Sequence, residues 1–409
     1  MSLWFIAWSY LWNRKLITAL TLLSVALGVA LIGTVLTLRE ETKKRFEEEG
    51  QAFDIVVGAK GSPLQLVLSA VYFMDRPTGN IDYAIYDQLR KHEDVGGAFP
   101  VGLGDTFRGF RLVGTTADLL SYVWTYRGEE RQPFQLADGR AFEKPMEAVV
   151  GSFVAEQTGL SVGDEFIGTH GLIELPKDLQ ITSHELHPYT VVGVLKPSGT
   201  PGDRAILCSI DSVWDLHAED VEPGMTTRDK ITAVLVDLKT PAARFQFKEF
   251  VNTEFNAMAT VPVDEIAKLY NQFLATAKTV LLTVGYLVVI VSALSIMIGL
   301  YLSILQRRRD MAIMRALGAS AFEIFGAVII ESFLVTILGI VTGWLLGNVV
   351  SWVFGLYLSQ KYGMSIGGLG LSVEHTYAYA VVALVGLLAG VLPAWQAYRT
   401  DVARNLAEA

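Results

Sequence analysis

The chain has 409 residues, of which 51% are hydrophobic and only 18% are charged. About a quarter of the residues in a typical soluble domain are charged, so this composition excludes an ordinary soluble protein. The formal net charge of −9 argues against nucleic acid as a partner. The single cysteine, Cys208, excludes an internal disulfide.

The N-terminal region predicts an interfacial helix and a first membrane span. Residues 1–15 are rich in Trp and Tyr, which gather at the headgroup level of a bilayer. Residues 16–38 carry no charge and are long enough to cross a hydrocarbon core of about 30 Å as a helix. A signal peptide is the competing interpretation, but the apolar run is too long for one and no clear cleavage site follows it. We therefore expect a retained span with Arg14 and Lys15 on the cytoplasmic side.

Residues 39–272 predict one soluble unit on the opposite side of the membrane, because no segment within them is long and apolar enough to span. Mixed charges at helical spacing over residues 39–49 predict a stalk, and residues 264–278 predict a return stalk. The region is large enough for its own core and has room for two subdomains.

The local patterns in this region alternate between strand and helix. Residues 147–168 predict a strand, a helix, a turn and a second strand, and residues 95–114 predict two strands around a glycine-rich turn. The other predicted strands are 54–58, 189–195, 204–209 and 231–238, and the predicted helices are 81–92 and 242–255.

The C-terminal part predicts three further spans. The third is longer than one bilayer needs, so we expect its outer end to project, tilt or break. Basic residues in the loops place both termini in the cytoplasm. The expected segments are span 273–305, cytoplasmic segment 306–321, span 322–358, extracytoplasmic loop 359–374, span 375–396 and cytoplasmic tail 397–409. The predicted fold is an α-helical membrane protein with four transmembrane helices and a large mixed α/β extracytoplasmic domain inserted between helices 1 and 2.

The cytoplasmic segment combines a basic cluster with a short helical pattern. Met311, Met314, Ala316 and Leu317 are spaced to line one side of a helix, with Ile313 on its flank. Gly318 is placed to end that helix. Periodicity alone leaves two interpretations open, a helix that contacts a cytoplasmic partner and a solvated loop whose arginines only fix topology.

The run from Arg309 to Ser320 resembles the cytoplasmic segment of the MacB/FtsX/LolC family of ABC transporter permeases. The basic turn before the first span, Glu331 with the glycines of the third, and the run from Leu392 to Arg399 agree with the same family. The resemblance implies a coupling helix that docks on a separate ATPase. Its expected coupling residues are Arg307, Arg308, Arg309, Asp310, Met311, Ile313, Met314, Arg315, Ala316, Leu317 and Gly318.

The same resemblance implies further expectations. The partners would be a cytoplasmic ABC ATPase, a second permease copy or paralogue, membrane lipid, and a periplasmic adaptor or substrate protein. The soluble domain would carry βαβ elements around a variable insert at about 110–190. The protein would lie in a bacterial cytoplasmic (inner) membrane, and its four spans would transmit motion rather than conduct substrate.

The chain has no G-x-x-x-x-G-K-[ST] sequence, so we expect ATP and Mg to bind a partner chain and this chain to hold no cofactor. No Ser/His/Asp set or paired carboxylates point to hydrolytic chemistry, so we expect a non-catalytic subunit. His170, His184 and His187 are candidate zinc ligands, but solvated loop histidines are the favoured interpretation and we expect no metal.

Three features of the spans and their surroundings have two interpretations each. Glu331 is the only charge inside the third span, and a tie to an arginine among 307–309 or 315 is favoured over a proton relay. The apolar run 71–74 beside 64–68 is favoured as core over a receiving surface for substrate. Small-residue ridges serve a dimer interface or packing within one subunit, and they consist of Gly339, Gly343, Gly347, Gly386 and Gly390.

The sequence predicts a permease that exports or releases a substrate from the outer leaflet or periplasm. One alternative is a regulator that switches an extracytoplasmic hydrolase or sensor without transport, and another is metal-related efflux through the histidine-containing loop. A standalone receptor or scaffold without an ATPase is also open.

Overall fold

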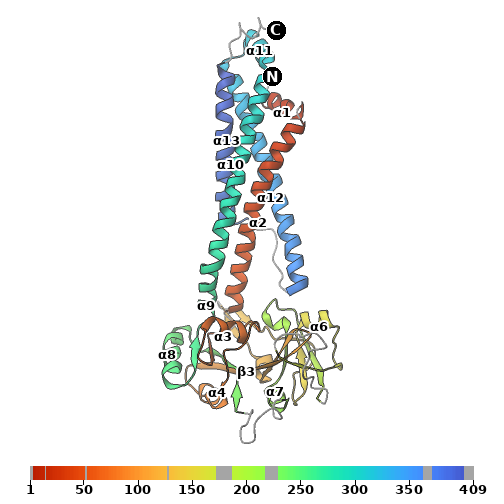
Figure 1. Ribbon diagram of the computed structural model, residues 1–409, viewed down its shortest axis with the longest axis vertical. Helices are drawn as coiled ribbons and strands as arrows, with labels where there is room; N and C mark the ends of the chain where they lie inside the picture. The colour runs from red at the N-terminus through yellow and green to blue at the C-terminus, as the bar shows by residue number, and fades with distance from the viewer. Residues whose placement is uncertain are drawn as a thin grey trace. The chain divides into compact units, whose positions relative to one another are not determined.

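The computed structural model describes residues 3–13, 15–50, 53–126, 129–171, 187–216, 229–362 and 371–399 (Figure 1). The chain forms two compact units. The helical unit comprises Met1–Thr42, Phe273–Gln360 and Ser365–Ala409, and the soluble unit comprises Lys43–Gln272 with Lys361–Met364.

Four long helices make up most of the helical unit. In the described part of the chain, four helices are long and apolar enough to cross a membrane, which confirms the predicted number. Large apolar side chains such as Leu287, Trp352 and Leu384 are more than half exposed, as expected of helices whose solvent is lipid. The helices are α1 (Leu3–Asn13), α2 (Lys15–Gly50), α10 (Ala275–Gln306), α11 (Arg308–Ala316), α12 (Ala321–Tyr362) and α13 (Val373–Tyr398).

Glycines let these helices pack closely within one chain. A Cβ added at Gly343 of α12 would lie 2.6 Å from both the carbonyl oxygen of Ala26 and the Cβ of Val29 in α2. Gly339 and Gly347 approach α2 in the same way, and Gly386 and Gly390 of α13 approach α12. Both predicted ridges therefore lie in intrachain contacts.

The third span and the return stalk are helical over their described lengths. Helix α12 is continuous for 42 residues, so of the expected outcomes for its outer end a break does not occur, and projection or tilt is left. The return stalk consists of α9 (Pro262–Leu269), a π-helical turn at Tyr270–Leu274 and the start of α10. The glycine-rich stretch at 363–370 lies outside the described residues.

One mixed sheet organises the described part of the soluble unit. Its strand order is β15-β1-β14-β3-β4-β12-β8-β11-β7, and β10 and β9 pair with β3 and β11. Short pairs also form between β2 (Ile81–Asp82) and β13 (Lys230–Ile231), and between β5 (Trp124–Tyr126) and β6 (Glu129–Arg131). The sheet strands are β1 (Ile55–Gly58), β3 (Val95–Phe107), β4 (Phe110–Thr115), β7 (Leu136–Gly139), β8 (Glu147–Val150), β9 (Glu165–Phe166), β10 (Thr169–His170), β11 (Tyr189–Leu195), β12 (Ala205–Ser209), β14 (Ala233–Leu238) and β15 (Met258–Thr260).

Strand β3 joins the two halves of this sheet. Its first half pairs antiparallel with β14 and its second half with β4, with a register shift between Leu103 and Thr106. Strand pairs β4/β12 and β8/β11 are parallel. The described strands β4, β8 and β11, which lie within residues 110–190, belong to the same sheet as β1 and β14.

Short helices cover the sheet and bury its core. Val71, Tyr72 and Phe73 are buried with Leu66 and Phe99, so the core interpretation of this apolar run is confirmed except at Met74, which is half exposed. The helices are α3 (Pro63–Ala70), α4 (Tyr83–Leu89), α5 (Asp118–Ser121), α6 (Ser152–Thr158), α7 (Ile210–Leu216) and α8 (Arg244–Glu254). The predicted mixed α/β class is confirmed.

Candidate functional site

Helix α11 is a short element with well-defined ends. It follows a break at Arg307, whose φ of −111° and ψ of 16° are not helical. At its C-terminus Gly318 adopts a φ of +106°, and its N–H donates to the carbonyl oxygen of Arg315 at 3.1 Å. Ser320 and Glu323 then form a capping box that starts α12, with the Ser320 N–H donating to the Glu323 carboxylate at 2.7 Å.

Side chains of α11 are divided between the bundle core and the surface. Met311 is 4% exposed and packs in the apolar core of the long helices, and Ala312 is fully buried. Ile313 is 42% exposed and Leu317 is 84% exposed. Arg308, Arg309, Asp310 and Ala316 are also exposed, whereas Met314 and Arg315 are half-buried.

The predicted single apolar face is therefore wrong for Met311. Helical spacing places apolar residues on one side, but it does not say whether that side meets the chain's own bundle or a partner. Here the Met311 side meets the bundle. Leu317 follows the last helical residue, so it no longer shares that face.

Arg307 belongs to an internal polar cluster. Its guanidinium lies over the Tyr10 ring, 3.6 Å from the centroid, and donates to the Tyr10 carbonyl oxygen at 3.3 Å. Its Nη1 lies 3.9 Å from a carboxylate oxygen of Glu331. The side chains of Arg307 and Glu331 are 12% and 8% exposed. This cluster ties α1 and α12 to the end of α10, and Figure 1 shows α1 and α11 at the same end of the helical unit.

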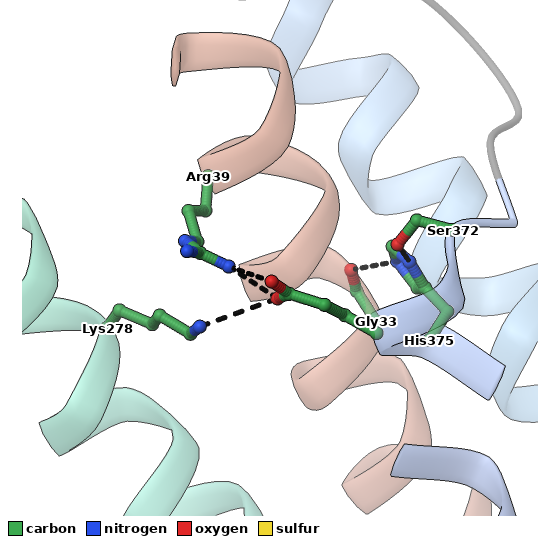
Figure 2. A network of polar contacts seen from close by, with 6 residues as sticks. Gly33, Arg39, Lys278, Ser372 and His375 are labelled. Atoms are coloured by element: carbon green, nitrogen blue, oxygen red, sulfur yellow. Dashed lines mark hydrogen bonds and ion pairs between the residues drawn. The ribbon is translucent and has the colours of Figure 1, made fainter. Parts of the chain in front are cut away.

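A second polar cluster lies in the same unit and was not singled out from the sequence (Figure 2). Glu374, in the first turn of α13, accepts hydrogen bonds from Arg39 of α2 and lies 3.4 Å from Lys278 Nζ of α10. His375 is 2% exposed, with Nε2 at 3.2 Å from the Gly33 carbonyl oxygen. Its Nδ1 lies 2.7 Å from Ser372 Oγ. The available signal was a Glu-His pair at the start of an otherwise apolar span.

The structure brings no metal ligands together in the part of the chain that it describes. No group of three or more His, Cys, Asp or Glu side chains there is arranged to hold a metal ion. His170 is in β10 and pairs with Asp105 of β3 through the backbone ladder. His187 is exposed, and His184 lies outside the described residues.

Glu147 and Cys208 of the soluble unit have pKa values shifted by their structural surroundings. Arg140 hydrogen-bonds the Glu147 carboxylate at 2.6 and 2.8 Å and, with the backbone N–H groups of Glu143 and Lys144, lowers the pKa of Glu147 to about 2. Burial raises the pKa of Cys208 to about 12, which keeps its thiol protonated and unreactive. Neither group points to catalysis.

Comparison with known families identifies the class of protein. The model of the FtsX-like permease C-terminal domain matches residues 282–402, a stretch that contains α11 and both polar residues Glu331 and Glu374. The model of the MacB-like periplasmic core domain matches residues 18–253, more than half of the chain. The chain therefore belongs to the MacB/FtsX-type family of ABC transporter permeases, which confirms the resemblance in the sequence.

Two solved structures are similar to the chain at 11% sequence identity. The periplasmic region of MacB from Actinobacillus actinomycetemcomitans covers 54% of this chain and 93% of its own, with a TM-score of 0.33. The extracellular domain of the noncanonical ABC-type transporter YknZ from Gram-positive bacteria covers 50% of this chain and 98% of its own, with a TM-score of 0.31. No curated protein sequence matches the chain significantly.

Membership of this family makes the chain a multi-pass membrane component of an ABC transporter, a component that is generally non-catalytic and works with a partner ATPase.

Proposed function

We propose that this chain is the permease subunit that receives motion from a cytoplasmic ATPase at α11 and transmits it to the soluble unit, to export or release a substrate there. The observation that carries the proposal is the division of α11. Met311 and Ala312 are buried in the bundle, while Arg308, Arg309, Ile313 and Leu317 are exposed beside them. A helix fixed on one side and open on the other passes an applied force to the helices behind it.

The exposed side of α11 suits a protein partner. Leu317 is 84% exposed, and it is flanked in the chain by the exposed residues Ala316 and Gly318. An exposed apolar side chain on a helix that also carries exposed arginines is typical of a docking surface with an apolar centre and a charged rim. Basic residues at this end, including Lys15 and Arg399, support a cytoplasmic location for it.

The rest of the assembly follows the family. We propose two permease subunits, identical or paralogous, with two ATPase subunits that bind ATP and Mg, in a bacterial inner membrane with both termini in the cytoplasm. Transport is favoured over pure regulation because the MacB-like core domain model covers most of the soluble unit. Metal-related efflux depends on the sequence alone, because His184 lies outside the described residues.

A charge-reversed docking surface tests the coupling site. The double variant Arg309→Glu, Leu317→Asp places carboxylates on the exposed side of α11 without touching buried Met311. We expect it to insert in the membrane normally but to lose most co-purification with the ATPase. Phe245→Asp is the matched control, because Phe245 is 79% exposed in the soluble unit. Normal ATPase recruitment by the double variant would refute the docking assignment.

ATP hydrolysis in liposomes separates transport from regulation. Export is supported if a compound stimulates ATP hydrolysis and is itself moved across the liposome membrane. Stimulation only by an extracytoplasmic hydrolase or sensor protein supports the regulatory alternative. If the chain binds no ATPase at all, the alternative of a standalone receptor or scaffold is supported.

A further inference from the structure

The cluster around Glu374 joins three helices through one carboxylate. Arg39 is in α2 and Lys278 is in α10, and both cations contact the same carboxylate of α13 (Figure 2). Glu374 lies in the first turn of its helix, where the helix dipole favours a negative charge. An ionic link between α2 and α10 at this level therefore passes through a residue that belongs to neither helix.

Helix lengths place these charges at one level of the membrane. At about 1.5 Å per residue, the helical paths from Lys15 to Arg39, from Gln306 back to Lys278 and from Arg399 back to Glu374 are each about 36 to 42 Å. A bilayer is about 40 to 45 Å thick including its headgroups. The cluster therefore lies near the headgroup level farthest from α11, just before α2 and α10 continue in sequence into the soluble unit.

His375 fixes the position of Glu374. Its ring is 2% exposed and its Nε2 faces both the Gly33 carbonyl oxygen and Thr37 Oγ1, at 3.2 and 3.1 Å. A neutral ring protonated at Nε2 donates to Gly33 and accepts at Nδ1 from the Ser372 hydroxyl, which satisfies both nitrogens. Because these partners lie on α2 and at the N-terminus of α13, the histidine sets the height of α13 against α2.

We propose that Glu374 is a latch that holds α2 and α10 together at the end of the bundle where they lead to the soluble unit. The latch rests on the proposed function, because α2 and α10 are the helices through which motion from α11 reaches that unit. With the carboxylate in place, the two cations are held by a common anion. When the carboxylate withdraws, the ionic link between Arg39 and Lys278 is lost. The contact thus holds the two helices together when closed and leaves them freer to separate when open, and His375 is the residue that positions it.

Distances between labels on α2 and α10 test the latch directly. In full-length protein in nanodiscs, with Cys208→Ala as background, exposed Glu40 and Ala277 are replaced by Cys and spin-labelled. Pulsed EPR then measures the separation of the two helices. We expect the parent to show one dominant short distance. Glu374→Gln should raise the share of a longer distance roughly threefold to tenfold.

Two further variants separate a latch from general packing. Lys278→Gln removes the other end of the same ionic link, so Glu374→Gln combined with Lys278→Gln should widen the distribution no more than Glu374→Gln alone. Glu156→Gln changes an exposed helical carboxylate in the soluble unit and should leave the distances as in the parent. An unchanged distribution in Glu374→Gln, or a further increase of the longer distance in the double variant, would overturn the latch.

The same samples distinguish failure of the latch from failure of the proposed function. If Glu374→Gln widens the distribution but the ATPase with a non-hydrolysable ATP analogue changes nothing in the parent, the latch is supported and the proposed transmission is refuted. If the analogue changes the distances in the parent while Glu374→Gln has no effect, transmission is supported and the latch is refuted.

Discussion

The two polar clusters of the helical unit stabilise it by different means. Near α11, Arg307 and Glu331 are almost fully buried, and the Tyr10 ring covers the guanidinium. In the Glu374 cluster, the side chains of Arg39 and Glu374 are 26% and 51% exposed. One cluster is a desolvated contact among α1, α12 and the break that follows α10, and the other is a partly hydrated contact among α2, α10 and α13.

This difference in exposure separates a fixed contact from a reversible one. Removing one partner of a buried ion pair leaves an uncompensated charge and costs about 3–5 kcal/mol. An exposed pair contributes only about 0–1 kcal/mol and weakens with salt. The proposed transmission needs a rigid connection where force is received and a contact that opens at low energetic cost where motion is released. The exposures of the two clusters are compatible with these two requirements.

The glycine contact between α2 and α12 should be the most sensitive position in the unit. Gly343→Val would push a side chain into the Ala26 carbonyl and the Val29 Cβ, neither of which can move freely. We expect a loss of about 3 kcal/mol or failure to form a monodisperse protein in detergent. Gly326→Val is the matched control, because a Cβ there meets only Leu3 at 3.7 Å. Equal thermal stability of the two variants would contradict the packing described.

The buried cluster should be the next most sensitive. Glu331→Leu leaves the Arg307 charge buried against Tyr10, and we expect a loss of about 3 kcal/mol in thermal unfolding. Arg307→Met combined with Glu331→Leu removes both charges and should recover most of that loss. A double variant as unstable as the single one would mean that the pair does not act as a unit.

The sequence predicted the fold of both units and one of the two clusters, for physical reasons. Charge-free runs of bilayer length define spans wherever they occur, so four helices and the inserted soluble region followed directly. A lone carboxylate in a span must find a cation, so the tie between Glu331 and an arginine was expected. The part of Tyr10 in that tie was not, because no local signal connects α1 with the end of α10.

The Glu374 cluster escaped prediction because its members look ordinary in sequence. Charges at the ends of spans are normal, and Arg39 and Glu374 are far apart along the chain. Met311 was misassigned for a different reason. A helical pattern shows two faces of α11, but only tertiary packing decides which of them is covered.

The ion pair of Arg140 and Glu147 in the soluble unit predicts how stability depends on pH. Because Glu147 has a pKa lowered from 4.5 to about 2, its contribution is fully present above pH 4.5 and is lost as pH falls toward 2. Allowing for the half-exposed Arg140, we expect about 1–2 kcal/mol. The parent protein should therefore lose more stability between neutral and acidic pH than the Glu147→Gln variant loses, as measured by thermal unfolding of the full chain. Parallel pH profiles for the two proteins would count against this contribution.

The salt dependence of the coupling energies should distinguish the two membrane clusters most clearly, although the expected change in energy is the smallest of the predicted effects. Raising ionic strength from about 0.05 M to about 1 M shortens the screening length from above 10 Å to about 3 Å. Double-variant cycles measure each coupling, with Gln replacements at Arg39 and Glu374 in one cycle and at Arg307 and Glu331 in the other. The coupling of Arg39 with Glu374 should fall from about 1 kcal/mol toward zero, because salt reaches that pair. The coupling of Arg307 with Glu331 should hardly change, because Tyr10 and the helices exclude ions from it. Equal salt dependence in the two cycles would remove the distinction between a fixed and a releasable end.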